Sequence, residues 1–476
     1  MCLLAVGAAW TPPPLRAGVA QTVWTPLAPA TPVLTLRAAI ALALEHSPEM
    51  RPAEDGVVLA GIQEELAESR FGLKITPTFR SGGFGYGLEQ QAFGLSVSKM
   101  LPTGTELSLF GDASRWNGGA SEFRDGGYAF TLSQPLLRGF GPVARSDVDA
   151  ARRGTERSTR RLGEARQQLI VNVADAYFAI VQHGRLLAAS DLALDRATRL
   201  RVASEARASV GLATQLDVLR ADLLASRSEA ERELQREALE TSRDRLNLIV
   251  GRLPGALLEV SESDIGADPF SAERLAGRPI DDLVSMAIAT RPEVAESRAG
   301  IGDARRSQSV ARWNMLPDVR LNASYAQRGF GSLDTAALNR LLGGWRLGVS
   351  TSYPLDQSAT AAAAATADVG LLAAERNVIE TERRVAADVR RAHRGWTRSA
   401  DTIVIQRKAL DIAERQLRLA ELRYERGIAD NFDVVDAEHQ VLQAQAALIA
   451  AEIGRELAGL QLLRAMGTLD ARSDAR

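Results

Sequence analysis

The sequence predicts a mainly α-helical protein with a smaller β portion, built on one plan that occurs twice. Apolar residues recur at helical spacing over very long stretches of the chain. Shorter stretches of alternating apolar and polar residues precede each of these long ones. Segments from the two halves also lie over each other without gaps. We therefore expect duplicated long α-helical hairpins, each joined to β-strands.

The internal repeat sets the expected boundaries. The matching segments pair LRAAIALALEHSPEM at 36–50 with IDDLVSMAIATRPEV at 280–294, and VGLATQLDVLRAD at 210–222 with RGIADNFDVVDAE at 426–438. These matches predict a first repeat at 34–253 and a second at 280–470. Residues 254–279 contain several glycines and prolines, which resist a continuous helix. We interpret them as a crossover linker.

Strands are expected at about 75–136 and 317–355. Within these ranges the segments FGLSVS, YAFTLS and WRLGVS alternate apolar with small or polar side chains, as a strand does between lipid and water. A soluble hairpin packed on the helices is the open alternative. One hairpin per repeat gives four strands, and a turn at 102–104 would raise the number to six. Either number is too small for one chain to close a barrel, so several chains would have to contribute.

A very long helix is expected after the strands of each repeat. Leu169, Val173, Ala176 and Ile180 follow the alternating four- and three-residue spacing of coiled-coil packing. No proline interrupts residues 143–209, and a helix of this length would reach about 100 Å.

Each long helix is expected to turn back at a glycine. The predicted hairpins and their tips are 143–250 with Gly211 and 358–467 with Gly427. A glycine beyond a long helical run accepts the positive φ that ends a helix. Thr214 and Asp430 follow these glycines and can cap the returning helices.

Composition excludes several classes of function. The 57 basic and 59 acidic residues leave a net charge of −2, without the basic stripe that a nucleic-acid partner requires. The single cysteine, Cys2, excludes a disulfide within the chain and a thiolate metal cluster. No apolar run reaches the roughly 18 to 20 residues of a membrane-spanning helix, so passage through a membrane would need a closed barrel.

The chain also lacks the residue patterns of an enzyme. Its four histidines are scattered, and no HExxH or phosphate-binding loop occurs. His439, beside Glu438, is interpreted as a surface residue rather than a metal ligand. We expect no catalytic residue, cofactor or metal. Residues 1–20 begin with a short apolar run followed by small residues, which predicts an export signal; a disordered apolar tail is the alternative.

Several motifs together resemble the TolC-like outer-membrane efflux protein family, also called outer membrane factors. They are the duplicated halves, the strand ending LSQPLLRGFG, and the tips VGLATQLDVL and YERGIADNFDVVDAE, over Leu34–Asp470. The resemblance implies a homotrimer with one transmembrane β-barrel in the outer membrane of a Gram-negative cell. Its long helices would form an α-barrel tunnel in the periplasm.

The resemblance also implies a function. Such a channel passively conducts solutes in a tripartite efflux or type I secretion system, and a periplasmic adaptor couples it to an inner-membrane pump. The candidate adaptor-docking residues lie at the two tips: Val210, Gly211, Leu212, Arg426, Gly427 and Ile428. The alternative is that these residues only form turns.

Four residues near the tips are candidates for the periplasmic gate. Asp433 and Asp436 are three residues apart, hence on one helix face, and match tunnel-facing aspartates of the family. In a trimer they would form a ring that attracts cations and resists closure. The alternative is a helix cap and a surface acid.

Tyr424 and Asp217 match family positions that latch the gate by a hydrogen bond between neighbouring hairpins. Ala429 stands where some members have an arginine in the same latch, so the closed state here is expected to be held differently. A non-channel periplasmic coiled-coil adaptor or scaffold is the alternative function. It would explain the coiled-coil spacing but not the duplication of the whole plan.

Overall fold

The computed structural model describes residues 33–84, 88–118, 121–262, 275, 277–332 and 342–469. The export signal predicted at 1–20 lies outside them, as do residues 263–274 and 276 of the predicted linker. The chain forms two compact units. The strand unit contains residues 56–159 and 296–379, and the tip unit contains the described parts of 20–55, 160–295 and 380–476.

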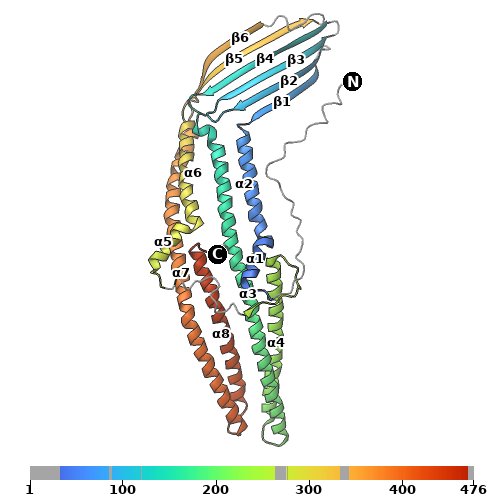
Figure 1. Cartoon of the computed structure of the whole chain (residues 1–476), viewed down its shortest axis with the longest axis vertical. Coiled ribbons are helices and arrows are strands. Elements are labelled where there is room, and N and C mark those ends of the chain that lie inside the picture. Colours follow the sequence, from blue (N-terminus) through green and yellow to red (C-terminus); the bar gives the residue numbers. More distant parts are fainter. Residues whose placement is uncertain are drawn as a thin grey trace. The chain divides into compact units, whose positions relative to one another are not determined.

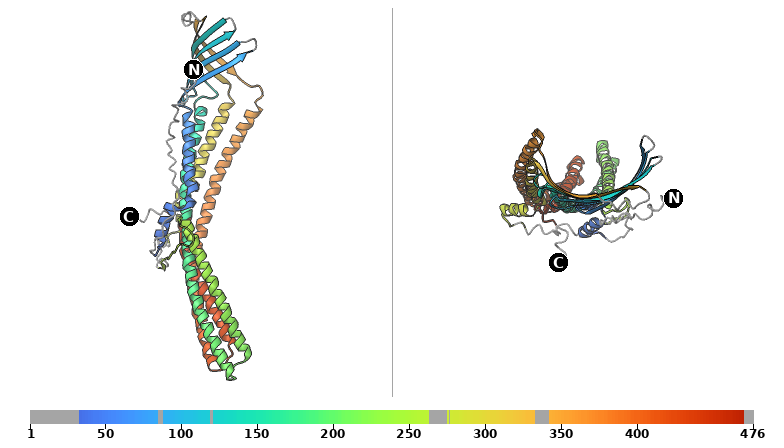
Figure 2. Two further views of the ribbon diagram at one scale, coloured as in Figure 1. Left: turned by 90° about the vertical axis from the view of Figure 1, so that its right-hand side faces the viewer. Right: turned by 90° about the horizontal axis from the view of Figure 1, so that it is seen from above.

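The strand unit contains one antiparallel sheet, in which six strands follow one another in chain order (Figure 1). They are β1 (Leu73–Phe84), β2 (Leu88–Met100), β3 (Glu106–Gly118), β4 (Ser121–Pro135), β5 (Asp318–Ser332) and β6 (Leu342–Ser352). The first repeat supplies four of these strands and the second supplies two, joined where β4 pairs with β5. Seen from above in Figure 2, the sheet is curved.

The strand register gathers apolar side chains on one face of the sheet. Phe79 lies opposite Phe93 on the neighbouring strand, and Phe130 lies opposite Tyr325. Strand alternation then places further large apolar side chains on this face, among them Ile75, Leu95, Leu109, Tyr128, Trp345, Leu347 and Val349. All of these are exposed, Trp345 at 78%.

The opposite face of the sheet is mostly polar, although Phe110 lies on it. Ser133 Oγ donates to Asn322 Oδ1 at 3.0 Å, and Asn322 Nδ2 donates to Ser350 Oγ at 2.8 Å. Arg328 forms an ion pair with Asp112 at 3.3 Å on the same face. These cross-strand pairs make a hydrogen-bonded polar surface. This face suits contact with water, whereas the apolar face suits contact with lipid.

Helices form most of the rest of the described chain, and the predicted fold class, mainly α with a β portion, is confirmed. They are α1 (Leu36–His46), the short η1 (Pro48–Met50), α2 (Arg51–Ser69), α3 (Pro142–Ser209), α4 (Gln215–Val250), α5 (Ile280–Thr290), α6 (Pro292–Asn314), α7 (Ser358–Glu425) and α8 (Phe432–Ala465). The long α3 and α7 each have 68 residues. None of the described helices has the length and apolarity needed to cross a membrane.

The core of the tip unit repeats the duplication seen in the sequence. In the first copy Leu36, Ala39 and Ala43 of α1 are fully buried against α3 and α4, beside Tyr177 and Phe178. In the second copy Leu283 and Ala287 of α5 pack against α7 and α8 in the same way. The short amphipathic helix of each repeat therefore supports the long hairpin of that repeat.

Candidate functional site: the two hairpin tips

The first tip lies between α3 and α4. Helix α3 ends at Ser209, and the N–H of Leu212 then donates to the carbonyl of Arg207 at 2.8 Å. Gly211 has a φ of +74°, a left-handed conformation that side chains with a Cβ rarely adopt. Glycine at this position is therefore what allows the long helix to stop and the chain to reverse.

A capping box begins the returning helix α4. The Thr214 side chain accepts from the N–H of Asp217 at 3.2 Å, and the Asp217 carboxylate accepts from the N–H of Thr214 at 2.9 Å. Two of the backbone N–H donors at the helix start are thus satisfied by side chains of the same turn. Asp217 is only 7% exposed, and its carboxylate caps the helix to which it belongs.

The second tip has the same turn geometry. The N–H of Ile428 donates to the carbonyl of Arg423 at 2.9 Å, and Gly427 has a φ of +69°. Here the Asp430 side chain accepts from the N–H of Phe432 at 3.2 Å. The tips therefore share the reversal of the chain but cap the returning helix with different residues.

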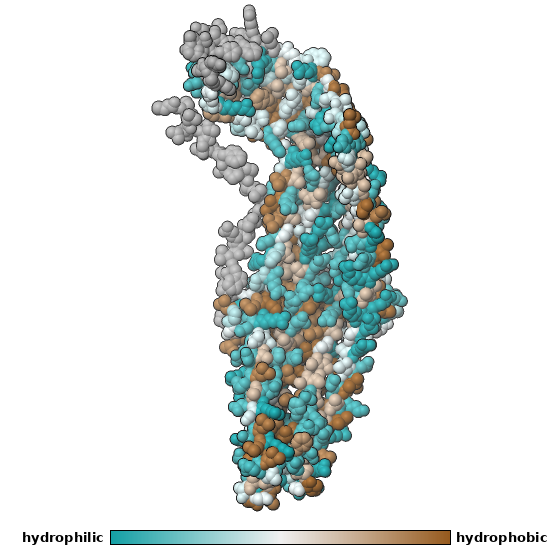
Figure 3. Space-filling view, turned by 180° about the vertical axis from the view of Figure 1, so that it is seen from behind, coloured by the Kyte–Doolittle hydropathy of each residue, from teal (hydrophilic) through white to brown (hydrophobic). Residues whose placement is uncertain are grey.

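The tips expose apolar side chains that nothing else in the described chain covers. Val210 is 67% exposed, Leu212 78% and Ile428 66%. Arg426 is also exposed. In Figure 3, apolar side chains gather toward the ends of the helical hairpins at the bottom of the view. Small apolar groups on rigid turns suit the binding of another protein.

Asp433 and Asp436 lie in the first turns of α8, on its exposed side. The carboxylate of Asp433 is 4.0 Å from Arg423 Nη1, and the carboxylate of Asp436 accepts from Gln440 Nε2 at 2.7 Å. Val434 and Ala437 on the other side of the helix are buried. The structure thus places both carboxylates on one solvent-facing side of the helix.

The structure does not bring Tyr424 and Asp217 together. The Tyr424 hydroxyl lies 2.9 Å from Ser204 Oγ on α3, and the Asp217 carboxylate is occupied by Thr214. The guanidinium of Arg207 lies over the Tyr424 ring, 4.4 Å from its centroid. Each residue of the predicted latch therefore has a partner other than the one that the resemblance implied.

A set of cross-hairpin contacts, here called the tip clamp, joins the two hairpins instead. Arg207 donates to the backbone carbonyls of Tyr424 at 2.6 Å and Glu425 at 2.8 Å. Asn431, fully buried, donates from Nδ2 to the backbone carbonyl of Asp217 at 2.6 Å.

A third contact of the tip clamp is an ion pair at 3.2 Å between Arg220 and Asp430. Sequence reasoning missed the tip clamp. One available signal was that Asn431 and Gln215 occupy equivalent repeat positions but differ in side-chain length.

A buried ion pair supports the hairpins further from the tips. Arg196 of α3 donates from Nε to both carboxylate oxygens of Glu438 on α8, at 2.7 and 3.0 Å. Burial raises the pKa of Glu438, and the charge of Arg196 partly offsets this. Leu200, Leu417 and Tyr424 pack in the adjoining apolar cluster. The seam between hairpins thus combines apolar packing with polar contacts that need both hairpins in place.

Comparison with known proteins gives the family context. The family model described as "Outer membrane efflux protein" matches residues 39–252 and 283–468. Among curated relatives, the outer membrane efflux protein BepC of Brucella suis is 24% identical over 434 residues, covering 87% of this chain and 89% of BepC. The outer membrane protein TolC of Vibrio cholerae is 25% identical, covering 68% of this chain and 73% of TolC. The fusaric acid resistance protein FusA of Burkholderia cepacia is 26% identical, but the match spans only 39% of FusA.

Solved structures share the fold. CusC, described as forming a transmembrane channel, superposes with a TM-score of 0.71 at 17% identity, covering 91% of this chain and 92% of CusC. The outer membrane protein VceC of Vibrio cholerae gives a TM-score of 0.69 at 19% identity, covering 91% and 96%. The family model and the curated relatives favour a channel over the alternative of a periplasmic adaptor or scaffold. Because the family model matches both repeats, the chain belongs to the outer membrane efflux protein family, whose members form outer-membrane channels with a periplasmic helical tunnel.

Proposed function

We propose that three copies of this chain form one passive export channel in the outer membrane. The observation that carries the proposal is the register of the sheet, which sets a mostly apolar face against a mostly polar one. Within the described chain, β1 and β6 each pair on one side only, and six strands are too few to enclose a tunnel. Pairing of β1 with β6 of the next copy would close a barrel that faces lipid outside and water inside. The channel would act without catalysis.

The hairpin tips are the proposed docking site for a periplasmic adaptor, which would link the channel to an inner-membrane pump. Val210, Leu212 and Ile428 supply exposed apolar contacts, and Arg426 adds a positive charge. Gly211 and Gly427 hold the turns in shape. A rigid apolar surface costs little conformational entropy when a partner binds.

Asp433 and Asp436 are the proposed selectivity residues at the periplasmic end. In a trimer their exposed carboxylates would form a ring of six, which attracts cations and makes a narrow closed state costly. Arg423 lies beside Asp433 and would screen part of this charge. Asp436 forms no ion pair within the described residues and accepts only from the neutral Gln440, so it would carry the larger share.

We propose that the tip clamp holds the two hairpins of each chain together in the closed state of the channel. Opening would separate the hairpins and break the bonds from Arg207 to the carbonyls of α7, together with the bond from Asn431. Tyr424 would act through Ser204 and Arg207 in this state. A direct bond between Tyr424 and Asp217 stays a prediction, because it requires Asp217 to leave its capping box.

Adaptor docking can be tested by placing a photo-crosslinking amino acid at Leu212 or Ile428 in intact cells. We expect capture of a periplasmic adaptor from both positions. Val404, equally exposed at 67% but far from the tips along α7, is the matched control and should capture none. Capture from Val404 alone, or from no position, would reject the docking assignment.

Charge removal tests the carboxylate ring. The double variant Asp433→Asn, Asp436→Asn should lose most of its preference for cations, because the fixed charges at the entrance are gone. Ion selectivity is measured from reversal potentials of single channels in planar bilayers under a salt gradient. Asp195→Asn is the control, since Asp195 is also exposed, on α3, and pairs within its own helix. Unchanged selectivity in the double variant would refute the proposal.

Removal of Arg207 tests the tip clamp. Arg207→Ala should raise the open probability of single channels by about tenfold or more, because each charge-assisted hydrogen bond contributes roughly 1.5–3 kcal/mol. Arg199→Ala is the control, because Arg199 on the same helix forms its ion pair with Asp195 of α3 and is not part of the tip clamp. Equal open probabilities for the Arg207 variant and the unmodified channel would show that the tip clamp does not hold the gate.

A further inference from the structure

The hairpin of β1 and β2 is a full part of the sheet. Strand β1 pairs with β2 along its whole length, and β2 pairs with β3 in the same way. They have 12 and 13 residues, more than the roughly 9–11 that a tilted strand needs to cross a bilayer. Exposed Ile75 and Phe79 of β1 and Leu95 of β2 continue the apolar face. Because the other four strands have 11 to 15 residues, all six strands are long enough to span a membrane.

The turn between β2 and β3 ties this hairpin to the chain that follows β4. Gly104 has a φ of +87°, and a Cβ added there would lie 2.5 Å from the carbonyl oxygen of Gly139. The buried hydroxyl of Thr105 donates to the side-chain oxygen of Gln134 on β4. These contacts keep the β1–β2 hairpin in line with the rest of the sheet.

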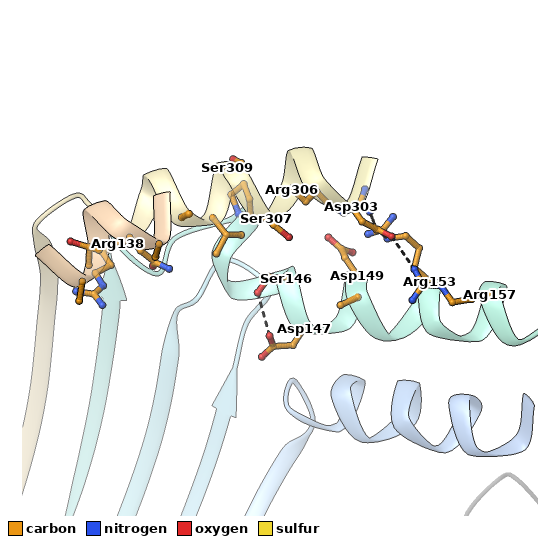
Figure 4. Close-up of a pocket in the computed structure, with 18 residues that line it drawn as sticks. Arg138, Ser146, Asp147, Asp149, Arg153, Arg157, Asp303, Arg306, Ser307 and Ser309 are labelled. Atoms are coloured by element: carbon orange, nitrogen blue, oxygen red, sulfur yellow. Dashed lines mark hydrogen bonds and ion pairs between the residues drawn. The ribbon is translucent and has the colours of Figure 1, made fainter. Parts of the chain in front are cut away.

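Ion pairs between α3 and α6 support the junction of the two repeats. Helix α3 follows β4 and helix α6 precedes β5, the two strands that pair at this junction. Asp303 of α6 pairs with Arg153 and Arg157 of α3, and Arg157 also pairs with Glu296 of α6. Figure 4 shows Arg153 and Asp303 facing each other between the two helices. The strands of both repeats are therefore held in one sheet.

Small side chains cover much of the polar face of this sheet. Examples are Gly94, Ser96 and Ser98 of β2 and Ala129, Thr131 and Ser133 of β4. Larger side chains, such as Phe110 and Arg346, are scattered among them. The hydroxyls of Ser108 and Thr131 bond to each other across neighbouring strands, so they are less available to bind a passing solute. A lumen lined by this face would be wide for its backbone and would hold solutes weakly.

We propose that three copies close a barrel of eighteen strands, six from each chain, and that the β1–β2 hairpin thereby sets the largest solute that can leave the channel. The proposal rests on the proposed function, because six strands close only with strands of other copies. The alternative is a barrel of twelve strands, in which β3 pairs with β6 of the next copy. That barrel would have to break the β2–β3 ladder, which occupies β3 over all 13 of its residues.

The number of strands sets the width of the lumen. With strands about 4.8 Å apart and tilted by about 40°, eighteen strands give a backbone radius of about 18 Å, against about 12 Å for twelve. Short side chains reduce each radius by about 4 Å, which leaves an opening about 28 Å across rather than about 16 Å. A solute about 20 Å across therefore passes the wider barrel and is excluded by the narrower one.

Thiol labelling from the cell exterior measures this width. Ser96→Cys places a thiol on the inner wall, whereas Leu95→Cys places one on the lipid-facing side. Intact cells are treated with a small maleimide or with maleimide-bearing polymers of graded size, and the labelled fraction is measured. We expect polymers about 20 Å across to label Ser96→Cys and those about 35 Å across to be excluded. Leu95→Cys should stay unlabelled, and the unmodified chain reports any labelling of Cys2.

Crosslinking between copies identifies the strand that closes the barrel. Thr78→Cys on β1 is combined with a cysteine at one of the positions 346–350 of β6, and a short thiol crosslinker is added to native outer membranes. We expect covalently linked trimers on denaturing gels. Ser108→Cys on β3, combined with the same positions, is the matched control, because its side chain lies on the same polar face. This control should give only single chains.

Failure of the smaller polymer to label Ser96→Cys, when the small maleimide does label it, would overturn the proposal. So would linked trimers from the Ser108→Cys variants, or from neither set, because β1 would then not close the barrel. These results leave the channel function standing. If not even the small maleimide reaches Ser96→Cys, the proposed function itself is rejected, because the polar face would not line a water-filled lumen.

Discussion

The register of the six-stranded sheet is the constraint on which the rest of the structure depends. Because side chains alternate along a strand, a shift of one residue between neighbours would mix apolar and polar side chains on both faces. The observed pairing, such as Phe79 with Phe93 and Phe130 with Tyr325, keeps the faces distinct. The pairing of β4 with β5 also joins the two repeats. Strands β4 and β6 finish at the same end of the sheet, where they lead into α3 and α7. The register therefore fixes where both long hairpins start.

Duplication produces two tips with the same turn, but their polar side chains make different contacts. The repeat aligns Thr214 with Asp430 and Asp217 with Asp433. In the first tip the aspartate is buried in a capping box, whereas in the second it is exposed on the helix. Asn431, one residue after Asp430, is free to cross to the first hairpin and bind a carbonyl there. Equivalent positions of the two repeats thus have different roles: Asp217 caps a helix at the first tip, and Asp433 adds charge to the surface at the second.

Local patterns explain what could be predicted from the sequence. The periodicity of Leu169, Val173 and Ala176 indicates helix whatever its surroundings, and these side chains are indeed buried. Gly211 and Gly427 were recognisable because few other residues accept a positive φ. The sequence allows either four or six strands, because a single barrel-type strand gives only a weak signal. The described residues form six.

The tip clamp was beyond prediction for a different reason. Arg207 and Tyr424 are far apart in the chain, so no local pattern connects them. For Asp217 the family resemblance and the local pattern pointed to different roles. The spacing of Thr214 and Asp217 is that of a capping box, and the structure follows this local preference.

Solvent accessibility along β2 in native outer membranes tests the central claim most directly. Spin labels are placed one at a time at residues 93–98, and their collisions with lipid-soluble oxygen and with a water-soluble relaxation agent are measured. We predict strict alternation, with oxygen favoured at Phe93, Leu95 and Val97 and the water-soluble agent favoured at Gly94, Ser96 and Ser98. Uniform access of the water-soluble agent to all six positions would contradict the account, because the apolar face would then not meet lipid.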